Sequence, residues 1–228
     1  MANFKTHLSV ACVASGLVAT CLLAGDVARP AETVLCFALG SAGGTLPDID
    51  SDNSVPLRLT FDLLSFFIAF LVMFSQPAGD SVVELLLIWG IAFLSVKYLV
   101  FYFFTRLTAH RGIFHSVPAG GVFWFLTTIL LHRLFNFPAL TAWMGGAFVF
   151  FGYLVHLVLD EIYSIDFSKM ALKTSSGTAL KLVSFYDMKA TVFMYTALIG
   201  LFFLMPDYKP FLDTFLNPAT WAGIRFLP

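Results

Sequence analysis

The residues best suited to chemistry in this chain are histidines and aspartates that occur in short motifs between long apolar stretches. The first motif is GTLPDIDSDNS, in which Asp48 and Asp50 follow Pro47. Carboxylates two positions apart repel each other unless a proton or a cation lies between them, and a metal ion is the usual solution. A solvated turn with capping aspartates is the alternative interpretation.

The second motif is HRGIFHS, in which five positions separate His110 from His115. On a regular helix this spacing puts the two side chains about 140° apart, so the chain must bend if both are to point inward. Arg111 lies between them and could bind an anionic group such as phosphate. Ser116 is a typical N-cap for a following helix. The alternative is an interfacial loop whose basic residues set the membrane topology.

The third motif is GYLVHLVLDE, in which His156 and Asp160 are four positions apart and therefore share one helix face. Polar groups in a membrane helix are costly and usually face the protein interior or a cavity. Histidine and carboxylate at this spacing form a familiar pair of metal ligands, although a His–Asp hydrogen bond that packs two helices is the alternative. His7, just before the first apolar run, becomes a candidate ligand only if that run begins at the same membrane face.

The composition indicates a protein whose solvent is lipid. Of the 228 residues 59% are hydrophobic and 12% are charged, whereas soluble domains are about 25% charged. The net charge of -1 provides no bulk attraction to nucleic acid, so we expect membrane lipids and not nucleic acid as partners. The three cysteines lie in apolar runs without a CxxC pair, which argues against both a disulfide framework and a thiolate zinc site.

Apolar runs approaching the length of about 17–25 residues needed to cross a bilayer organise the chain. We find seven: Leu8–Ala24, Ala31–Leu46, Leu59–Ser75, Val82–Phe104, Val117–Leu131, Leu140–Leu159 and Ala190–Met205. The first is longer than the apolar part of a signal peptide and is interpreted as a span. The sequence therefore predicts an all-α transmembrane bundle of about seven helices in a single domain over residues 1–207, with an extramembrane segment at 160–189 and a C-terminal tail at 208–228.

Seven crossings assign each motif to a membrane face. The N-terminal arm, the PDID loop, the HRGIFH loop and the segment 160–189 share one face. That face has eight lysines and arginines against four on the other: Lys5, Arg58, Arg106, Arg111, Lys169, Lys173, Lys181 and Lys189 against Arg29, Arg133, Lys209 and Arg225. The positive-inside rule makes the richer face cytoplasmic. The candidate ligands thus converge on the cytoplasmic face, and Asp62 and Lys97, both within spans, could face the same cavity.

The combined pattern resembles the YdjM-like family of LexA-binding, inner-membrane-associated, metal-dependent hydrolases. An early histidine, a G..LPDID…S segment, an HRG..HS segment and a late G…H…D helix occur in the same order, over roughly residues 1–166. PDID and HRGxxHS are specific only in combination. The chain is also distantly similar to zinc-dependent phospholipase C, but it lacks the full set of histidines of those enzymes, so one or two ions are expected.

The motifs and the resemblance together predict an inner-membrane hydrolase that cleaves a phosphoester of a lipid or lipid-linked substrate. The expected metal ligands are His7 at the rim of the cavity, Asp48, Asp50, His110, His115, His156 and Asp160. Zn²⁺ is the favoured ion, with Mn²⁺ or Mg²⁺ as alternatives. It would activate water, with Asp50 as general base and Arg111 holding the phosphate. A transporter or ion carrier, or a metal-stabilised protein without catalysis, are the alternatives; the few polar residues near the opposite face favour the hydrolase.

Overall fold

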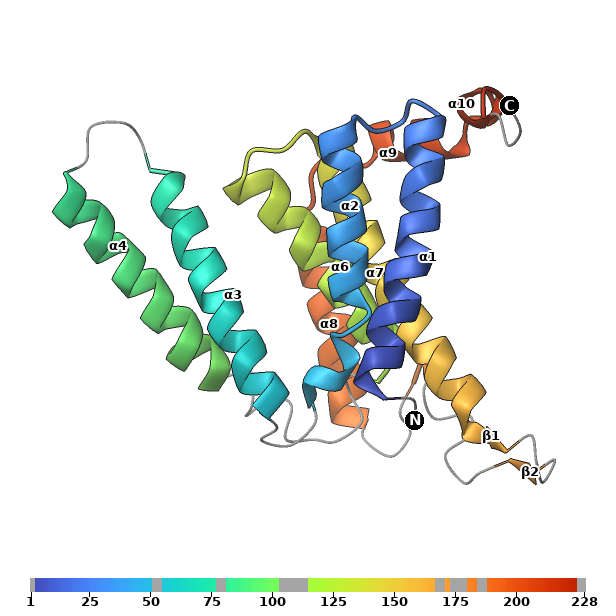
Figure 1. Cartoon of the computed structure of the whole chain (residues 1–228), viewed down its shortest axis with the longest axis horizontal. Coiled ribbons are helices and arrows are strands. Elements are labelled where there is room, and N and C mark those ends of the chain that lie inside the picture. Colours follow the sequence, from blue (N-terminus) through green and yellow to red (C-terminus); the bar gives the residue numbers. More distant parts are fainter. Residues whose placement is uncertain are drawn as a thin grey trace. The chain divides into compact units, whose positions relative to one another are not determined.

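Helices form nearly all of the part of the chain that the computed structural model describes, which is residues 3–50, 55–76, 81–102, 115–166, 171–172, 180–183 and 188–224. The chain divides into two compact units (Figure 1), one of residues 1–47 and 112–228 and one of residues 48–111. Each unit is described by itself.

The first unit contains the helices on which most of the motifs lie. Its helices are α1 (Phe4–Ala24), α2 (Pro30–Gly43), α6 (Val117–Ile129), the π-helical η3 (Leu130–Leu134), α7 (Ala139–Ser164), α8 (Met188–Phe202), α9 (Lys209–Leu216) and α10 (Pro218–Ala222). The two-residue strands β1 (Ile165–Asp166) and β2 (Ala171–Leu172) pair antiparallel after α7.

The second unit is largely a helical hairpin. It contains α3 (Val55–Phe74), α4 (Val82–Leu94) and the π-helical η2 (Ser95–Val100), and it begins within the 3-10 helix η1 (Pro47–Asp50). Lys97 and Asp62, which sequence analysis considered for the metal cavity, pair with each other at 2.9 Å from Nζ to Oδ1. The Lys97 ammonium also lies 5.5 Å from the centre of the Phe93 ring.

The predicted all-α membrane architecture is confirmed. Each of the seven predicted spans falls on a helix, and four helices among the described residues have the length and apolar composition to cross a membrane: Phe4–Ala24, Val82–Val100, Val117–Leu134 and Ala139–Ser164. The second and seventh spans are short helices, as their short apolar runs suggest. The helix count of seven is approximate.

The helices of the first unit begin where side chains or proline complete the first turn. Asn3 caps α1, because its Oδ1 accepts a hydrogen bond of 2.8 Å from the Thr6 backbone N–H. Pro30 begins α2 with a preset backbone angle. Ser116 caps α6 through the Ala119 N–H, as its position in the sequence predicted. These starts determine where His7 and His115 lie relative to their helices.

Glycines bring α2 and α7 into backbone contact. A Cβ added at Gly152 of α7 would overlap the carbonyl group of Gly40 on α2, and one at Gly43 would overlap the carbonyl group of Val149. Small residues allow this close approach of membrane helices, which is stabilised by van der Waals packing. The contact brings the carboxyl end of α2 against the part of α7 that carries the third motif.

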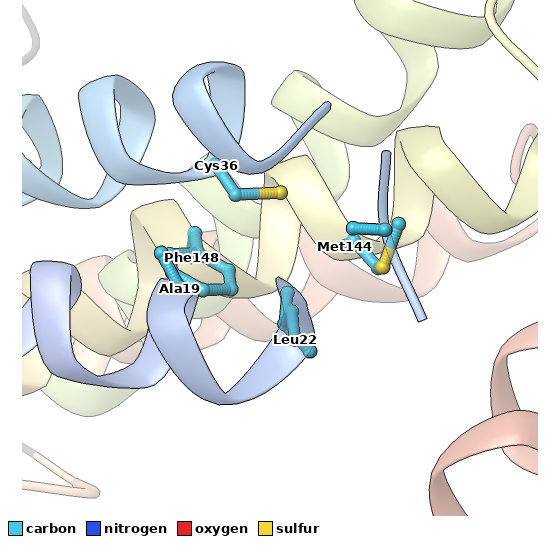
Figure 2. Packing of buried hydrophobic residues seen from close by; sticks show 6 residues of the cluster. Ala19, Leu22, Cys36, Met144 and Phe148 are labelled. Atoms are coloured by element: carbon cyan, nitrogen blue, oxygen red, sulfur yellow. The ribbon is translucent and has the colours of Figure 1, made fainter. Parts of the chain in front are cut away.

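An apolar core fills the end of the first unit where α1 ends and α2 begins, away from His7. It is made of Ala19, Leu22, Ala28, Cys36, Met144 and Phe148, which come from α1, α2, α7 and the α1–α2 loop (Figure 2). The residues that sequence analysis treated as a tail form α9 and α10, which add partly buried Phe211, Phe215 and Trp221 to this core. The C-terminal segment is therefore part of the packing of the first unit.

Candidate metal site

His7 lies in the first turn of α1 and is almost completely buried. Its backbone N–H donates to the Asn3 carbonyl at 3.1 Å, and only 1% of its surface is exposed. The predicted position at the rim of a cavity is therefore wrong. His7 is covered because it shares the buried face of α1 with Ala11 and Ser15, one and two turns along the helix.

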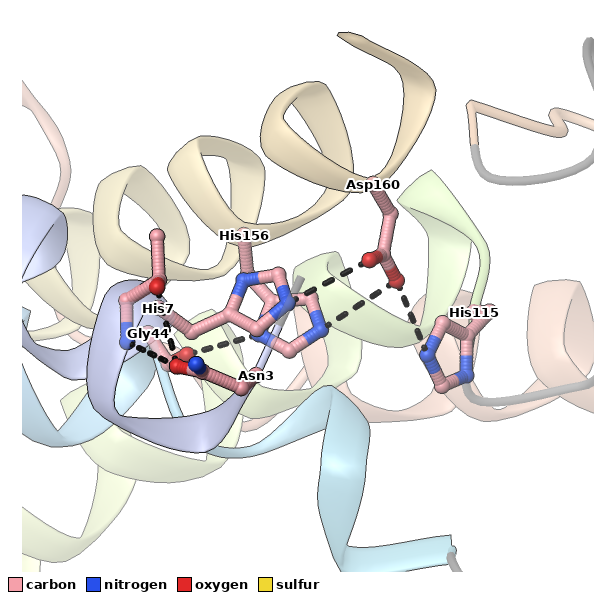
Figure 3. Close-up of polar contacts among 7 residues, drawn as sticks. Asn3, His7, Gly44, His115, His156 and Asp160 are labelled. Atoms are coloured by element: carbon pink, nitrogen blue, oxygen red, sulfur yellow. Dashed lines mark hydrogen bonds and ion pairs between the residues drawn. The ribbon is translucent and has the colours of Figure 1, made fainter. Parts of the chain in front are cut away.

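His156 and Asp160 lie one turn apart on the buried face of α7. His156 is 0% exposed and Asp160 is 5% exposed, so both polar groups have left water almost entirely. Burying polar groups is costly unless they are hydrogen-bonded or paired, and the two side chains are in fact directed toward each other and toward His7 (Figure 3).

One carboxylate lies among three imidazoles. Asp160 Oδ1 is 3.2 Å from His7 Nε2, and Asp160 Oδ2 is 3.6 Å from both His115 Nε2 and His156 Nε2. The rings of His7 and His156 are stacked, with centroids 3.6 Å apart and an interplanar angle of 13°. Figure 3 shows the imidazoles and the carboxylate converging from α1, α7 and the start of α6.

The backbone of Gly44 decides which nitrogen of His156 carries the proton. The Nδ1 atom is 2.8 Å from the Gly44 carbonyl oxygen. Because a carbonyl oxygen only accepts hydrogen bonds, Nδ1–H is the donor. In the neutral ring Nε2 then carries a lone pair, and this lone pair faces the anionic Asp160 Oδ2. Either a second proton on His156 or a cation bound by both groups makes that contact favourable.

The stacking of the histidine rings limits how many of them can be protonated. Two imidazolium rings stacked at 3.6 Å would repel each other, and the single nearby carboxylate neutralises only one of them. Apart from the 3.2 Å contact of Nε2 with Asp160, no residue that the structure describes makes a hydrogen bond with a ring nitrogen of His7. Nε2 of His7 would bind a cation in the tautomer that leaves its lone pair on that atom.

The donor atoms have the spacing that a small metal ion requires. Ligand atoms at about 2.0–2.1 Å from a tetrahedral Zn²⁺ lie roughly 3.3 Å from one another. The His7–Asp160 and His156–Asp160 distances are 3.2 and 3.6 Å, and the donor atoms of all three residues lie within 4.8 Å of one another. The hydrogen bond from His156 to Gly44 matches the outer contact that orients metal-binding histidines. The residue types and these distances therefore fit a divalent metal, and the stacked rings of His7 and His156 would have to turn out of their parallel arrangement for both to face one ion.

His115 provides the more accessible side of this arrangement. Its side chain is 19% exposed, and it directly precedes Ser116, the N-cap of α6. Because the cap fixes where α6 begins, it also fixes the backbone next to His115. His115 is therefore the most exposed of the four clustered side chains.

Of the remaining predicted site residues, the structure describes some and not others. Asp48 and Asp50 are the second and last residues of η1, but the side chain of Asp50 lies outside the described part of the chain, as do His110 and Arg111. Asp48 belongs to the second unit. It directly follows Pro47, a fully buried residue of the first unit.

His132 illustrates an ordinary contact of a partly buried histidine at the other end of the same unit. Its Nδ1 lies 2.9 Å from the Phe137 carbonyl oxygen, and it contributes to no metal-type cluster among the described residues. It differs from His156, whose second nitrogen faces a carboxylate.

The backbone carbonyl of Gly44 is the functional group that sequence reasoning missed. Glycine has no side chain that could bind a metal, and in the PDID motif the sequence drew attention to the carboxylates of Asp48 and Asp50 instead. The sequence contains one hint of this contact, because both the first and the third motif contain glycine. Gly152 lies one turn before His156 and allows α2 to approach α7. Only the contact itself identifies the carbonyl as the partner of His156.

Comparison with known proteins supports the membrane assignment and names the family. The family model of the YdjM inner membrane protein matches residues 1–212. No curated protein and no solved structure gives a significant match. Because the match covers most of the chain, and because the described helices include several able to cross a bilayer, the chain belongs to the YdjM inner membrane protein family.

Proposed function

We propose that this protein is a membrane-embedded, metal-dependent hydrolase that cleaves a phosphoester of a lipid or lipid-linked substrate. The observation that carries the proposal is the contact between His156 Nε2 and Asp160 Oδ2, made while Nδ1 donates to the Gly44 carbonyl. This orientation presents a lone pair to a carboxylate, which is favourable when both groups bind one cation.

The proposed ligands are His7, His156 and Asp160, with His115 next to them. Histidine and carboxylate ligands favour Zn²⁺ or Mn²⁺ over Mg²⁺, and Zn²⁺ is our first choice. Three protein ligands are typical of catalytic zinc, whose remaining position is open to water. When bound, the ion lowers the pKa of a water molecule and makes hydroxide available near neutral pH.

The protein's own groups would orient this chemistry. Asp160 accepts contacts on both carboxylate oxygens, so its plane is held between His7 on one side and His115 and His156 on the other. The Gly44 carbonyl holds the His156 ring in one tautomer. Such fixed ligands need little reorganisation during reaction.

Asp48, Asp50 and Arg111 complete the proposal from the sequence. The PDID motif supports Asp48 as a further ligand, because two carboxylates so close in sequence favour a cation between them. We assign Asp50 as general base and Arg111 as the residue that holds phosphate oxygens. A site at the cytoplasmic face would suit a substrate whose head group lies at the surface and whose acyl chains remain in lipid.

The apolar far end of the first unit supports a hydrolase more than a transporter. A transporter needs access to its site from both membrane faces. Within the described part of the first unit, the end away from His7 is filled by the core around Leu22, Met144 and Phe148 and covered by α9 and α10 (Figures 1 and 2). Access from one face is sufficient for an enzyme.

Hydrolysis of bis(p-nitrophenyl) phosphate and of phospholipid vesicles by detergent-purified protein tests the proposal. We expect zinc-dependent turnover in the wild type and a loss of at least about a hundredfold in His156→Ala and Asp48→Asn, as is common when catalytic charge stabilisation is removed. His132→Ala is the matched control and should retain activity. Equal activity in wild type and His156→Ala would refute the assigned metal site, and equal activity in Asp48→Asn would refute the role of Asp48.

A further inference from the structure

A segment from the long α7–α8 connection lies beside His115. Residues 180–183 include Lys181, which forms a parallel bridge with Ser116. The Lys181 carbonyl accepts a hydrogen bond of 3.1 Å from the Val117 N–H. Neighbouring strands lie about 4.8 Å apart, so the backbone of Lys181 lies next to the residue that follows His115.

The same segment is also attached to α8. The hydroxyl group of Tyr195 donates to the Leu182 carbonyl at 3.1 Å. Hydrogen bonds from α6 and from α8 thus hold two successive carbonyls, those of Lys181 and Leu182. This part of the connection is therefore a fixed edge of the first unit.

Lys181 carries a positive charge that no acid neutralises among the residues that the structure describes. The side chain is half-buried, and lysine carries its compact charge on a flexible four-carbon stem. The backbone of Lys181 is bridged to Ser116, the residue that follows His115. From there the stem can bring the ammonium group to a ligand bound beside the partly exposed His115.

We propose that Lys181 is a ligand-binding residue that holds a phosphate group of the substrate at the His115 side of the site. The inference rests on the proposed function and adds a cation that the motifs did not indicate. Lysine often binds phosphate as a point charge. The phosphate could belong to a lipid head group or to a soluble ester, because the chemistry of recognition is the same.

The test compares Lys181→Gln with Lys181→Arg and with the matched control Lys209→Gln in the full-length purified protein. Lys209 begins α9 at the other end of the first unit, so its replacement makes the same charge change far from His115. Calorimetry measures the affinity of each protein for inorganic phosphate in the presence of Zn²⁺, and a separate titration measures the affinity for Zn²⁺. Phosphatidic acid in phosphatidylcholine nanodiscs is the second phosphate probe.

We expect Lys181→Gln to weaken phosphate binding about tenfold or more, the loss typical of one hydrogen bond to a charged group. Zinc affinity should not change, Lys181→Arg should retain most of the phosphate affinity, and Lys209→Gln should behave as wild type. A larger loss with phosphatidic acid than with inorganic phosphate would assign the contact to a lipid head group; a loss with inorganic phosphate alone would assign it to a soluble ester.

Two results would overturn the role of Lys181. One is a phosphate affinity that is the same in Lys181→Gln as in the wild type. This result includes the case in which neither protein binds phosphate. The other is an equal loss in Lys209→Gln, which would mean a general effect of surface charge. Failure of the proposed function is recognised separately. If the wild type binds no zinc, the proposed metal site is refuted, whereas the phosphate titrations still decide the role of Lys181.

Discussion

The two ends of the first unit bury polar groups in contrasting ways. At the α9 end, Glu32 Oε1 accepts a hydrogen bond of 2.8 Å from Thr141, and the Trp143 indole N–H donates to the Pro206 carbonyl. Both of these donors meet an acceptor, whereas the indole N–H of Trp124, whose ring lies against that of Trp143, has no hydrogen-bond partner among the described residues. At the His7 end, ring nitrogens of three histidines face one carboxylate, and the facing nitrogen of a neutral His156 carries a lone pair. Burial of polar groups is common to both ends, so burial alone does not indicate function; the mismatch between neighbouring acceptors does.

The largest expected effect comes from removing the shared carboxylate. Asp160→Ala should reduce bound zinc from about one ion per chain to near zero, because Asp160 contacts all the clustered histidines and a catalytic zinc with three protein ligands tolerates no such loss. Elemental analysis of detergent-purified protein measures this. His132→Ala, which removes a histidine at the other end, should retain the metal. Metal retained in Asp160→Ala would place the ion elsewhere.

A methyl group between α2 and α7 should have the next largest effect. Gly152→Ala would put a Cβ into the carbonyl of Gly40, and overpacking of this kind costs about 1–3 kcal/mol or more. Thermal unfolding in detergent should therefore occur at a lower temperature, with weaker zinc binding because the Gly44–His156 contact is displaced. Gly200→Ala on α8 is the control, since nothing lies within 4 Å of its added Cβ. Equal stability of both variants would contradict the close helix contact.

Metal removal should destabilise only a protein that has the intact cluster. At a free zinc concentration of about 100 times its dissociation constant, binding stabilises the folded state by roughly 2.7 kcal/mol. Chelation should lower the unfolding temperature of the wild type by several degrees and leave His7→Ala unchanged. An identical zinc-dependent shift in both proteins would exclude His7 as a ligand.

The smallest effect is expected at the apolar end. Trp143→Phe removes the hydrogen bond to the Pro206 carbonyl but keeps an aromatic ring against Phe211, whose ring centre lies 5.8 Å from that of Trp143. The loss should be about 1 kcal/mol, measured by unfolding, with zinc content unchanged. Loss of zinc in this variant would mean that the two ends are coupled, and the comparison between them would need revision.

Much of the helical architecture was predictable because it follows from composition. Lipid requires every backbone polar group to be bonded within the segment, so long apolar runs become helices, and each of the seven predicted runs coincides with helix over most of its described residues. The positions of Ser116 as a helix cap and of His156 and Asp160 on one face also followed from local rules. The C-terminal helices were missed because Phe211 and Trp221 are few and scattered, and their burial depends on a core formed by other helices.

By itself the sequence determined the class of protein, the helical segments and the residue types that a metal site would use. Helix periodicity and hydrophobicity are local properties, which a single segment expresses without its neighbours. Only the tertiary structure decided that His7 is buried and stacked on His156, that Gly44 sets the tautomer of that ring, and that Lys181 lies beside His115. These relations join distant segments through packing and backbone hydrogen bonds, and no local pattern contains them.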